Sequence, residues 1–191
     1  MKLARIAARA RRQLREFPHD ERGISAVEFA MLLPLMVTLY LGGVEVSQAI
    51  AIDRKTTVVA RSVGDLVAQT TEVSTTDMTS ILAAATAIVA PYSDTKLKVT
   101  VSSVKIDAQN VAKIAWSDTK NGTARAVGST VTLPGVLNTA GTWLVWAEAA
   151  YEYTPAIGYV ITGSMNLTDQ IYMRPRQSDC VKRTGVVTAC N

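Results

Sequence analysis

Two glutamates in the C-terminal half have the residue type and spacing of an acid–base pair. Glu148 and Glu152 lie four residues apart, and two carboxylates held on one surface are the groups that glycoside hydrolysis requires. The residues around them read as a strand, in which positions four apart project from the same face. We interpret the pair as a solvated or ion-paired sheet face that meets Arg174 and Arg176, and not as a catalytic site.

Other groups suited to catalysis are scarce. His19 is the one histidine of the sequence, and it precedes the long apolar segment, so Ser-His-Asp and Cys-His mechanisms lack a base in the rest of the chain. The sequence contains no phosphate-binding loop, no dinucleotide-binding glycine pattern and no zinc-ligand spacing. We therefore expect no enzymatic activity, no cofactor and no metal site.

Both cysteines lie close together near the C-terminus. Cys180 and Cys190 are separated by nine residues that include Gly185, with no histidine nearby. In an oxidising compartment such a pair can close a small loop, whereas a metal site would need at least two further ligands from elsewhere. We predict a disulfide between Cys180 and Cys190; the alternative is two reduced thiols without a role.

One acid lies where a charge is costly. The segment from Ile24 to Val44 reads ISAVEFAMLLPLMVTLYLGGV, and Glu28 is its only charged residue. Its 21 residues, at about 1.5 Å each, make about 31 Å of helix, which is enough to cross the hydrocarbon layer of a membrane. A carboxylate deep in that layer costs on the order of 2.5–3.5 kcal/mol and usually has a partner or a function. Pro34 removes one helical hydrogen bond and predicts a kink.

The surplus of positive charge is confined to the beginning of the chain. Seven of the 20 Lys and Arg residues and three of the 16 Asp and Glu residues lie at positions 1–23, and the remaining 13 of each sign cancel. The positive-inside rule then places the N-terminus in the cytoplasm and everything after Val44 across the membrane. A neutral domain lacks the positive surplus that nucleic-acid binding requires, so we expect no nucleic-acid partner.

The residues before Glu28 suggest how its charge is balanced. Cleavage between Gly23 and Ile24 would leave Ile24 as a positively charged N-terminus and Glu28 as the fifth residue, directly before Phe29. Residues four apart share a helix face, so the carboxylate could pair with its own amine or with that of an adjacent subunit and offset the desolvation of both. Gly23, which has no Cβ, would let a peptidase approach the backbone.

Three alternatives would lead to other mature proteins or to another role for Glu28. The carboxylate could simply extend to the nearby membrane surface. A secretory signal could be cut near Ala49-Ile50-Ala51, although the apolar segment is longer than the usual length of about 7 to 15 residues. The segment could also remain an uncleaved single-pass anchor that retains residues 1–23.

Helical periodicity continues beyond the apolar segment and then recurs. One apolar stripe predicts that the first helix extends to a frayed end near Thr70-Thr71; its members are Ile52, Val59, Val63 and Leu66. A second helix is expected at residues 76–90, with Asp77 in its first turn and Pro91 as its stop. Its inward positions are Ile81, Leu82, Ala85, Ile88 and Val89.

The rest of the sequence predicts strands. Apolar alternation over residues 97–106 changes phase, which predicts a bulge near Ser102-Ser103, and Ile114 with Trp116 marks a second strand. Residues 143–153 form the clearest strand, with one unbroken apolar face, and Asn121-Gly122 is typical of a hairpin turn. A last strand is expected at residues 170–176. Helices followed by strands indicate an α+β fold with an antiparallel sheet.

Four short segments resemble one known family. Residues 23–34 (GISAVEFAMLLP) are similar to the N-terminal signature of TadE-like proteins, and the Glu28-Phe29 pair resembles Flp-type, tight-adherence pilins. The segments LVWAE at 144–148, YEYTP at 151–155 and YMRPR at 172–176 resemble the C-terminal region of the same family.

The resemblance implies a substrate of a prepilin peptidase that becomes a minor pilin or pseudopilin of a tight-adherence type IV pilus. It implies a pilin-like α+β fold in three parts: a basic leader at 1–23, a transmembrane and assembly helix at 24–46, and an extracytoplasmic domain at 47–191. The location would be the bacterial inner membrane, and the partners would be other pilins and the pilus assembly platform.

A second hypothesis belongs to a different class. The chain would be an unprocessed, membrane-anchored adaptor or adhesin of a pilus or secretion system, whose head binds a partner or ligand. Tyr172, Arg174 and Arg176 alternate along the last predicted strand and are the candidate partner surface.

Overall fold

A computed structural model describes residues 22–155, 158, 162–186 and 190, and it confirms the α+β class. A long helix and a shorter one precede most of the strands. The elements in chain order are α2 (Arg22–Ala68), β1 (Glu72–Val73), α3 (Thr75–Val89), η2 (Asp94–Lys96), β2 (Leu97–Ile106), β3 (Ala112–Lys120), β4 (Thr130–Val131), η3 (Gly135–Leu137), β5 (Trp143–Tyr153), β6 (Met165–Met173) and β7 (Lys182–Arg183).

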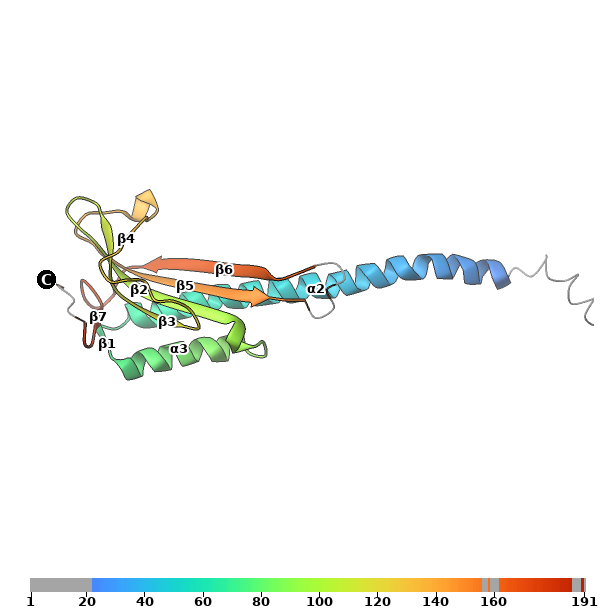
Figure 1. The fold of residues 1–191 in the computed structure, drawn as a ribbon, viewed down its shortest axis with the longest axis horizontal. Helices are drawn as coiled ribbons and strands as arrows, with labels where there is room; N and C mark the ends of the chain where they lie inside the picture. Colours follow the sequence, from blue (N-terminus) through green and yellow to red (C-terminus); the bar gives the residue numbers. More distant parts are fainter. Residues whose placement is uncertain (1–21, 156–157, 159–161, 187–189, 191) are drawn as a thin grey trace, which may run out of the picture.

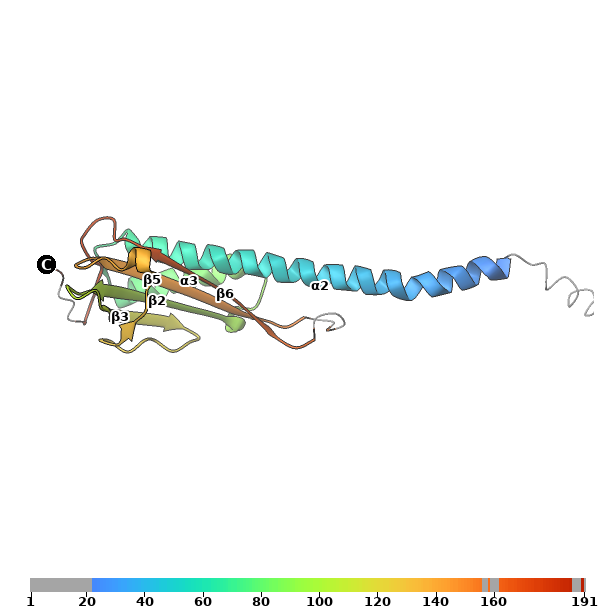
Figure 2. The ribbon, with the colours of Figure 1, turned by 90° about the horizontal axis from the view of Figure 1, so that it is seen from above.

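The main sheet of the head is antiparallel and five-stranded, with two helices on one face, and β1 and β7 form a separate two-stranded parallel sheet. The strand order is β4-β3-β2-β5-β6, and the C-terminal half of α2 lies along β5 and β6 while α3 lies beside α2 (Figure 1). The N-terminal half of α2 extends far beyond the head (Figures 1 and 2). The molecule is therefore a compact head on a long helical stalk.

The apolar stripe of α2 is confirmed except at its last position. Ile52, Val59 and Val63 are buried against the sheet, but Leu66 is 39% exposed and the adjacent Val67 is buried in its place. The buried positions Val59, Val63 and Val67 are each four residues apart, a spacing slightly longer than one turn of 3.6 residues, so the buried face shifts gradually around the helix toward Val67. At Gly64 the helix approaches the sheet closely: an added Cβ would lie 3.2 Å from side-chain carbons of two sheet residues.

Helix α3 begins and ends one residue before its predicted limits. Ser74 caps its N-terminus: the hydroxyl accepts a hydrogen bond from the Asp77 backbone N–H, and the Asp77 carboxylate accepts one from the Ser74 backbone N–H. At the other end, Lys55 of α2 donates to the backbone oxygens of Ile88 and Ala90 at 2.8 and 2.7 Å. Both ends of α3 thus have partners for groups that a helix leaves unpaired.

The capping carboxylate predicts a pH-dependent contribution to stability. The pKa of Asp77 lies below its ordinary value of 3.8, because the carboxylate accepts hydrogen bonds from the hydroxyl and the backbone N–H of Ser74. A carboxyl group with a lower pKa in the folded chain stabilises the fold above its unfolded pKa, and this contribution is lost as the pH falls through the folded pKa.

We expect Asp77→Asn to lower the thermal unfolding midpoint at pH 7 and the difference from wild type to shrink below about pH 4. Circular dichroism melts across pH 3 to 8 would measure this difference. Asp53→Asn, at an exposed position of α2, is the matched control. A constant difference across the whole pH range would contradict the assignment.

The phase change in the apolar pattern of β2 has a different cause from the one predicted. The register between β2 and β3 does shift between Ser103 and Val104, so the bulge is confirmed, but the extra residue is Ala115 of β3. Strand β2 pairs with β5 without interruption. Its side chains alternate throughout, and the apolar residues move to the opposite face because a second, smaller core covers that face at the end that contains Val104 and Ile106.

Two further predictions are corrected. The strand predicted at residues 170–176 is β6, which runs from Met165 to Met173, and a further short strand, β7, follows it. Asn121 does have the left-handed backbone typical of a tight turn, with φ of 55°. The chain then runs through residues 121–129 before β4, which pairs with the start of β3. The Asn121 side chain donates to backbone oxygens of Asp94 and Leu97, so this turn secures η2 and does not close a two-residue hairpin.

Candidate functional site

The stalk is the most unusual surface of the molecule. Every described side chain from Gly23 to Val37 is exposed, and large apolar residues such as Met31 and Leu39 expose 75% and 67% of their surface. Water does not favour such a surface. Among the described residues, α2 is the single helix that is long and apolar enough to span a membrane.

The residues predicted for processing lie at the free end of this stalk. Helix α2 begins at Arg22, so Gly23 and Ile24 lie in its first turn, and a Cβ added at Gly23 would meet nothing within 4 Å. Glu28 and Phe29 follow on the exposed helix. The basic segment at positions 1–21 lies outside the described residues.

Pro34 is accommodated inside the helix. The helical assignment continues through it, and the Thr38 hydroxyl donates to the Pro34 backbone oxygen at 2.8 Å. Figure 2 shows that the exposed part of α2 changes direction, as expected where proline removes a helical hydrogen bond. This bond partners the Thr38 hydroxyl within the helix, whereas the acceptor that the proline leaves without a helical donor is the Ala30 backbone oxygen.

The stalk meets the head at Glu45. This residue is 1% exposed, and its backbone oxygen accepts a hydrogen bond of 3.1 Å from the hydroxyl of Tyr153, at the end of β5. Burial, and then the nearby Glu45, raise the pKa of the Tyr153 hydroxyl, which stays protonated as a donor. The end of β5 is thereby held against α2 at the point where the exposed stalk ends and the head begins.

The outer face of the sheet carries the glutamate pair in a different setting from the predicted one. Glu148 pairs with Arg125, whose Nε and Nη2 donate to both carboxylate oxygens at 2.7–3.1 Å. The guanidinium also lies 4.0 Å from the ring centroid of Trp146, which stacks on Tyr172. Glu152 is exposed. The expectation that Arg174 and Arg176 would meet this face is therefore wrong for Glu148, whose carboxylate is already held by another arginine.

The candidate partner surface is divided. Tyr172 lies on the outer face against Trp146, while Arg176 forms an ion pair with Asp65 of α2, on the helical face. Arg174 lies beyond the end of β6, beside a cavity that Lys105 and Trp143 also line. The three side chains therefore do not form the continuous surface that strand alternation predicted, because β6 ends at Met173.

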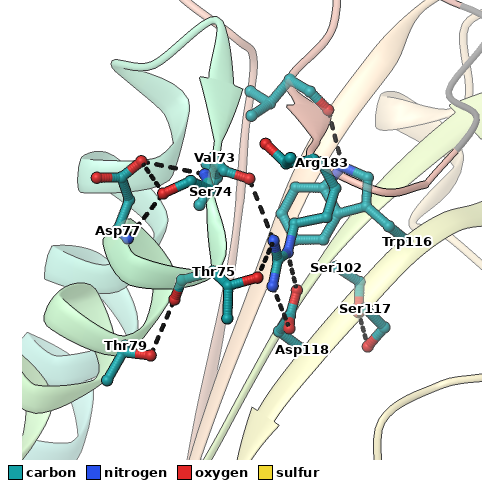
Figure 3. Close-up of polar contacts among 12 residues, drawn as sticks. Val73, Ser74, Thr75, Asp77, Thr79, Ser102, Trp116, Ser117, Asp118 and Arg183 are labelled. Carbon is teal, nitrogen blue, oxygen red and sulfur yellow. Dashed lines mark hydrogen bonds and ion pairs between the residues drawn. The ribbon is translucent and has the colours of Figure 1, made fainter.

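The C-terminal segment is joined to the head by several long-range contacts (Figure 3). The disulfide between Cys180 and Cys190 is present as predicted, and β7 pairs in parallel with β1. The Trp116 indole N–H donates to the Val181 backbone oxygen at 2.7 Å. We call this group of contacts, with the ion pair of Arg183 and Asp118, the C-terminal latch.

Arg183 is the centre of the latch. Its Nε and Nη2 donate to the two carboxylate oxygens of Asp118 at 2.8 and 3.2 Å, and its Nη1 donates to the Val73 backbone oxygen and the Thr75 hydroxyl at 3.3 Å. The side chain is 10% exposed. Its pKa is raised above the ordinary value by the hydrogen bond to Asp118, so it remains charged.

Sequence reasoning missed the polar residues that organise the head. Lys55, Arg125 and Arg183 each form contacts with residues at least 23 positions away, and no local pattern predicts such pairs. Among the described residues, no three His, Cys, Asp or Glu side chains gather in a way that could hold a metal ion.

A comparison with known protein families finds a match for the stalk. Residues 23–64 match the model of the family described as TadE-like protein, which confirms the resemblance found at residues 23–34. The match covers the stalk and most of the part of α2 that packs on the sheet, and it ends before the C-terminal segments that also resemble the family. No curated protein and no solved structure matched the chain.

Proposed function

We propose that this TadE-like protein of the tight-adherence pilus system is a minor pilin or pseudopilin that assembles through its stalk after a prepilin peptidase has cut it between Gly23 and Ile24. The family match supports an association with this pilus and with its other components. The observation that carries the finer proposal is the exposed stalk, with one acid at the fifth position after the predicted cut.

The exposed apolar surface of the stalk would be covered in two ways, one before assembly and one after it. Before assembly, its apolar surface would be covered by lipid, with the head outside the cytoplasmic membrane. After assembly, stalks of neighbouring subunits would cover one another, because van der Waals packing between helices can replace contacts with lipid. The head would remain outside in both states.

Glu28 would specify how the stalks align. Cleavage creates an amine at Ile24, one helical turn from Glu28, and both charges are costly in an apolar setting. An ion pair between the carboxylate and the amine of the same or an adjacent subunit would offset part of this cost. Such a pair can form only at certain axial offsets, so it would select one register.

Determination of the mature N-terminus tests this proposal. We expect protein purified from native membranes to begin at Ile24, because the Gly23–Ile24 bond precedes the acid by the spacing that this pairing requires. Intact-mass measurement and N-terminal sequencing would check this. Material that begins at Met1 would support an unprocessed anchor, adaptor or adhesin, and a start after Ala51 would support a secretory signal; either result would refute the proposed processing.

A further inference from the structure

A groove lies where the stalk meets the base of the head. It has a volume of about 580 Å³ and its lining is mainly apolar. One wall is the stretch of α2 that contains Leu39, Tyr40, Gly43, Val44 and Ala51, and the other is Tyr92, in the connection that follows α3. Leu39 and Tyr40 expose 67% and 72% of their surface.

The second wall is fixed by polar contacts. The Tyr92 backbone N–H donates to Val89 at the end of α3. Lys55 of α2 binds the backbone oxygens of Ile88 and Ala90, which brings that end of α3 against α2. The backbone that carries Tyr92 is thus held against α2 as part of the folded head.

The length of the stalk determines the depth of this groove in a membrane. If the hydrocarbon layer begins near Ile24, its thickness of about 30 Å is crossed by about 20 residues at 1.5 Å each, and the opposite boundary falls near Val44. The head begins directly afterwards, at the buried Glu45. No spare length of helix lifts the head away from the membrane, so the groove lies at the level of the lipid headgroups.

The side chains that line the groove are of a kind found at the depth of the lipid headgroups. Tyrosine is favoured at membrane interfaces because its ring is apolar and its hydroxyl is polar, and Tyr40 and Tyr92 lie on opposite walls of the groove. The sequence between Tyr153, whose hydroxyl contacts Glu45, and Met165 contains no charged residue. Charged residues follow Tyr92 closely, at Asp94 and Lys96, and Asp94 pairs with Lys120. Charged groups are tolerated among lipid headgroups but are costly in the hydrocarbon layer, so they are compatible with the headgroup level and with no deeper position.

We propose that the base of the head rests on the outward surface of the membrane and that the groove holds part of a phospholipid, its glycerol region and the upper part of one acyl chain. This inference rests on the proposed function, because it requires the stalk to span the membrane. A lipid is favoured over a second helix because the groove is continuous with the stalk surface that lipid covers and opens at headgroup depth.

Depth measurements by spin labelling test the inference. Full-length protein in phosphatidylethanolamine/phosphatidylglycerol nanodiscs would carry one maleimide nitroxide at Leu33→Cys, Ser93→Cys or Val136→Cys, with the native disulfide left oxidised. Leu33 lies in the stalk, Ser93 follows Tyr92, and Val136 is 94% exposed in η3, the short helix that follows β4. Figure 1 shows β4 at the end of the head away from the stalk. Power saturation would compare accessibility to oxygen, which is enriched in lipid, with accessibility to a water-soluble nickel complex.

We expect a deep position for Leu33, a water-exposed position for Val136 and an interfacial position for Ser93, with an oxygen-to-nickel ratio several-fold above that of Val136. Tyr92→Glu should move the Ser93 label to the Val136 value, while Tyr92→Trp should preserve its depth. Circular dichroism melts would confirm that both variants remain folded, and a variant that unfolds would be replaced by Tyr40→Glu.

Three other outcomes would each overturn the lipid assignment for a different reason. A deep Leu33 with Ser93 at the Val136 value would overturn the inference and leave the membrane anchor intact. A Leu33 label in water would refute the anchor itself. Spin–spin broadening at Ser93 that disappears on dilution with unlabelled protein would assign the groove to a second copy of the chain and would also overturn the lipid assignment.

Discussion

Glu28→Ala is expected to reduce incorporation of this protein into pili at least about tenfold while leaving its insertion into the membrane intact. Loss of the carboxylate removes an insertion cost on the order of 2.5–3.5 kcal/mol, so the anchor itself becomes no weaker. The lost ion pair with the Ile24 amine, by contrast, leaves that cation unpaired among packed stalks, where about 1.4 kcal/mol already corresponds to a tenfold change.

The experiment separates assembly from insertion. Immunoblots would compare sheared pili with carbonate-washed membranes, and N-terminal sequencing would establish that the variant is still processed. Glu28→Gln, which keeps the shape and removes the charge, should behave like alanine. Ser25→Ala, an uncharged change on the same exposed turn, should assemble normally. Normal incorporation of Glu28→Ala would show that the acid does not pair as proposed.

Arg183→Met is expected to cause the largest loss of stability in the head, about 2–4 kcal/mol. Removal of one partner of a buried ion pair usually costs about 3–5 kcal/mol, because the other charge stays buried without compensation. A lower range applies here because the Asp118 side chain is 26% exposed. The variant also loses the bonds from the guanidinium to Val73 and Thr75, which join β7 to β1 and to the first residue of α3.

Urea unfolding of the detergent-solubilised full chain, followed by tryptophan fluorescence, would measure this loss. Lys182→Met is the matched control, because Lys182 is the exposed neighbour in the same strand, and it should change stability by less than about 0.5 kcal/mol. The double variant Arg183→Met/Asp118→Leu should recover part of the loss, because no charge is then left unpaired. Equal effects of Arg183→Met and Lys182→Met would show that the latch contributes little.

The two long elements of the N-terminal half were predictable because their signals are local. The apolar run and the 3.6-residue stripe of α2, and the apolar positions of α3 between Asp77 and Pro91, involve residues within a few turns of one another. The single error on α2, Leu66 for Val67, arose because two adjacent apolar residues both lie near the edge of the stripe. The alternation of β5 likewise predicted its buried face correctly.

Tyr172, Arg174 and Arg176 do not share one continuous face, for a physical reason that alternation cannot reveal. Alternation places residues on one face only while the strand continues, and β6 ends at Met173. Arg176 then turns to Asp65, because a carboxylate on α2 is within reach. The partner of Glu148 was missed in the same way, since Arg125 comes from a loop that crosses the outer face.

The amino-acid sequence alone predicted an apolar helix long enough to span a membrane, the position of its single acid, the pair of cysteines and the α+β class. These follow from the polarity of neighbouring residues and from the periods of helix and strand. Only the tertiary structure decided that Glu45 is buried where the stalk ends, that Tyr92 forms a groove with the stalk, and that Arg183 joins the C-terminal segment to the head. Each of these depends on residues distant in the chain, whose contacts form when the apolar faces of α2 and the sheet come together.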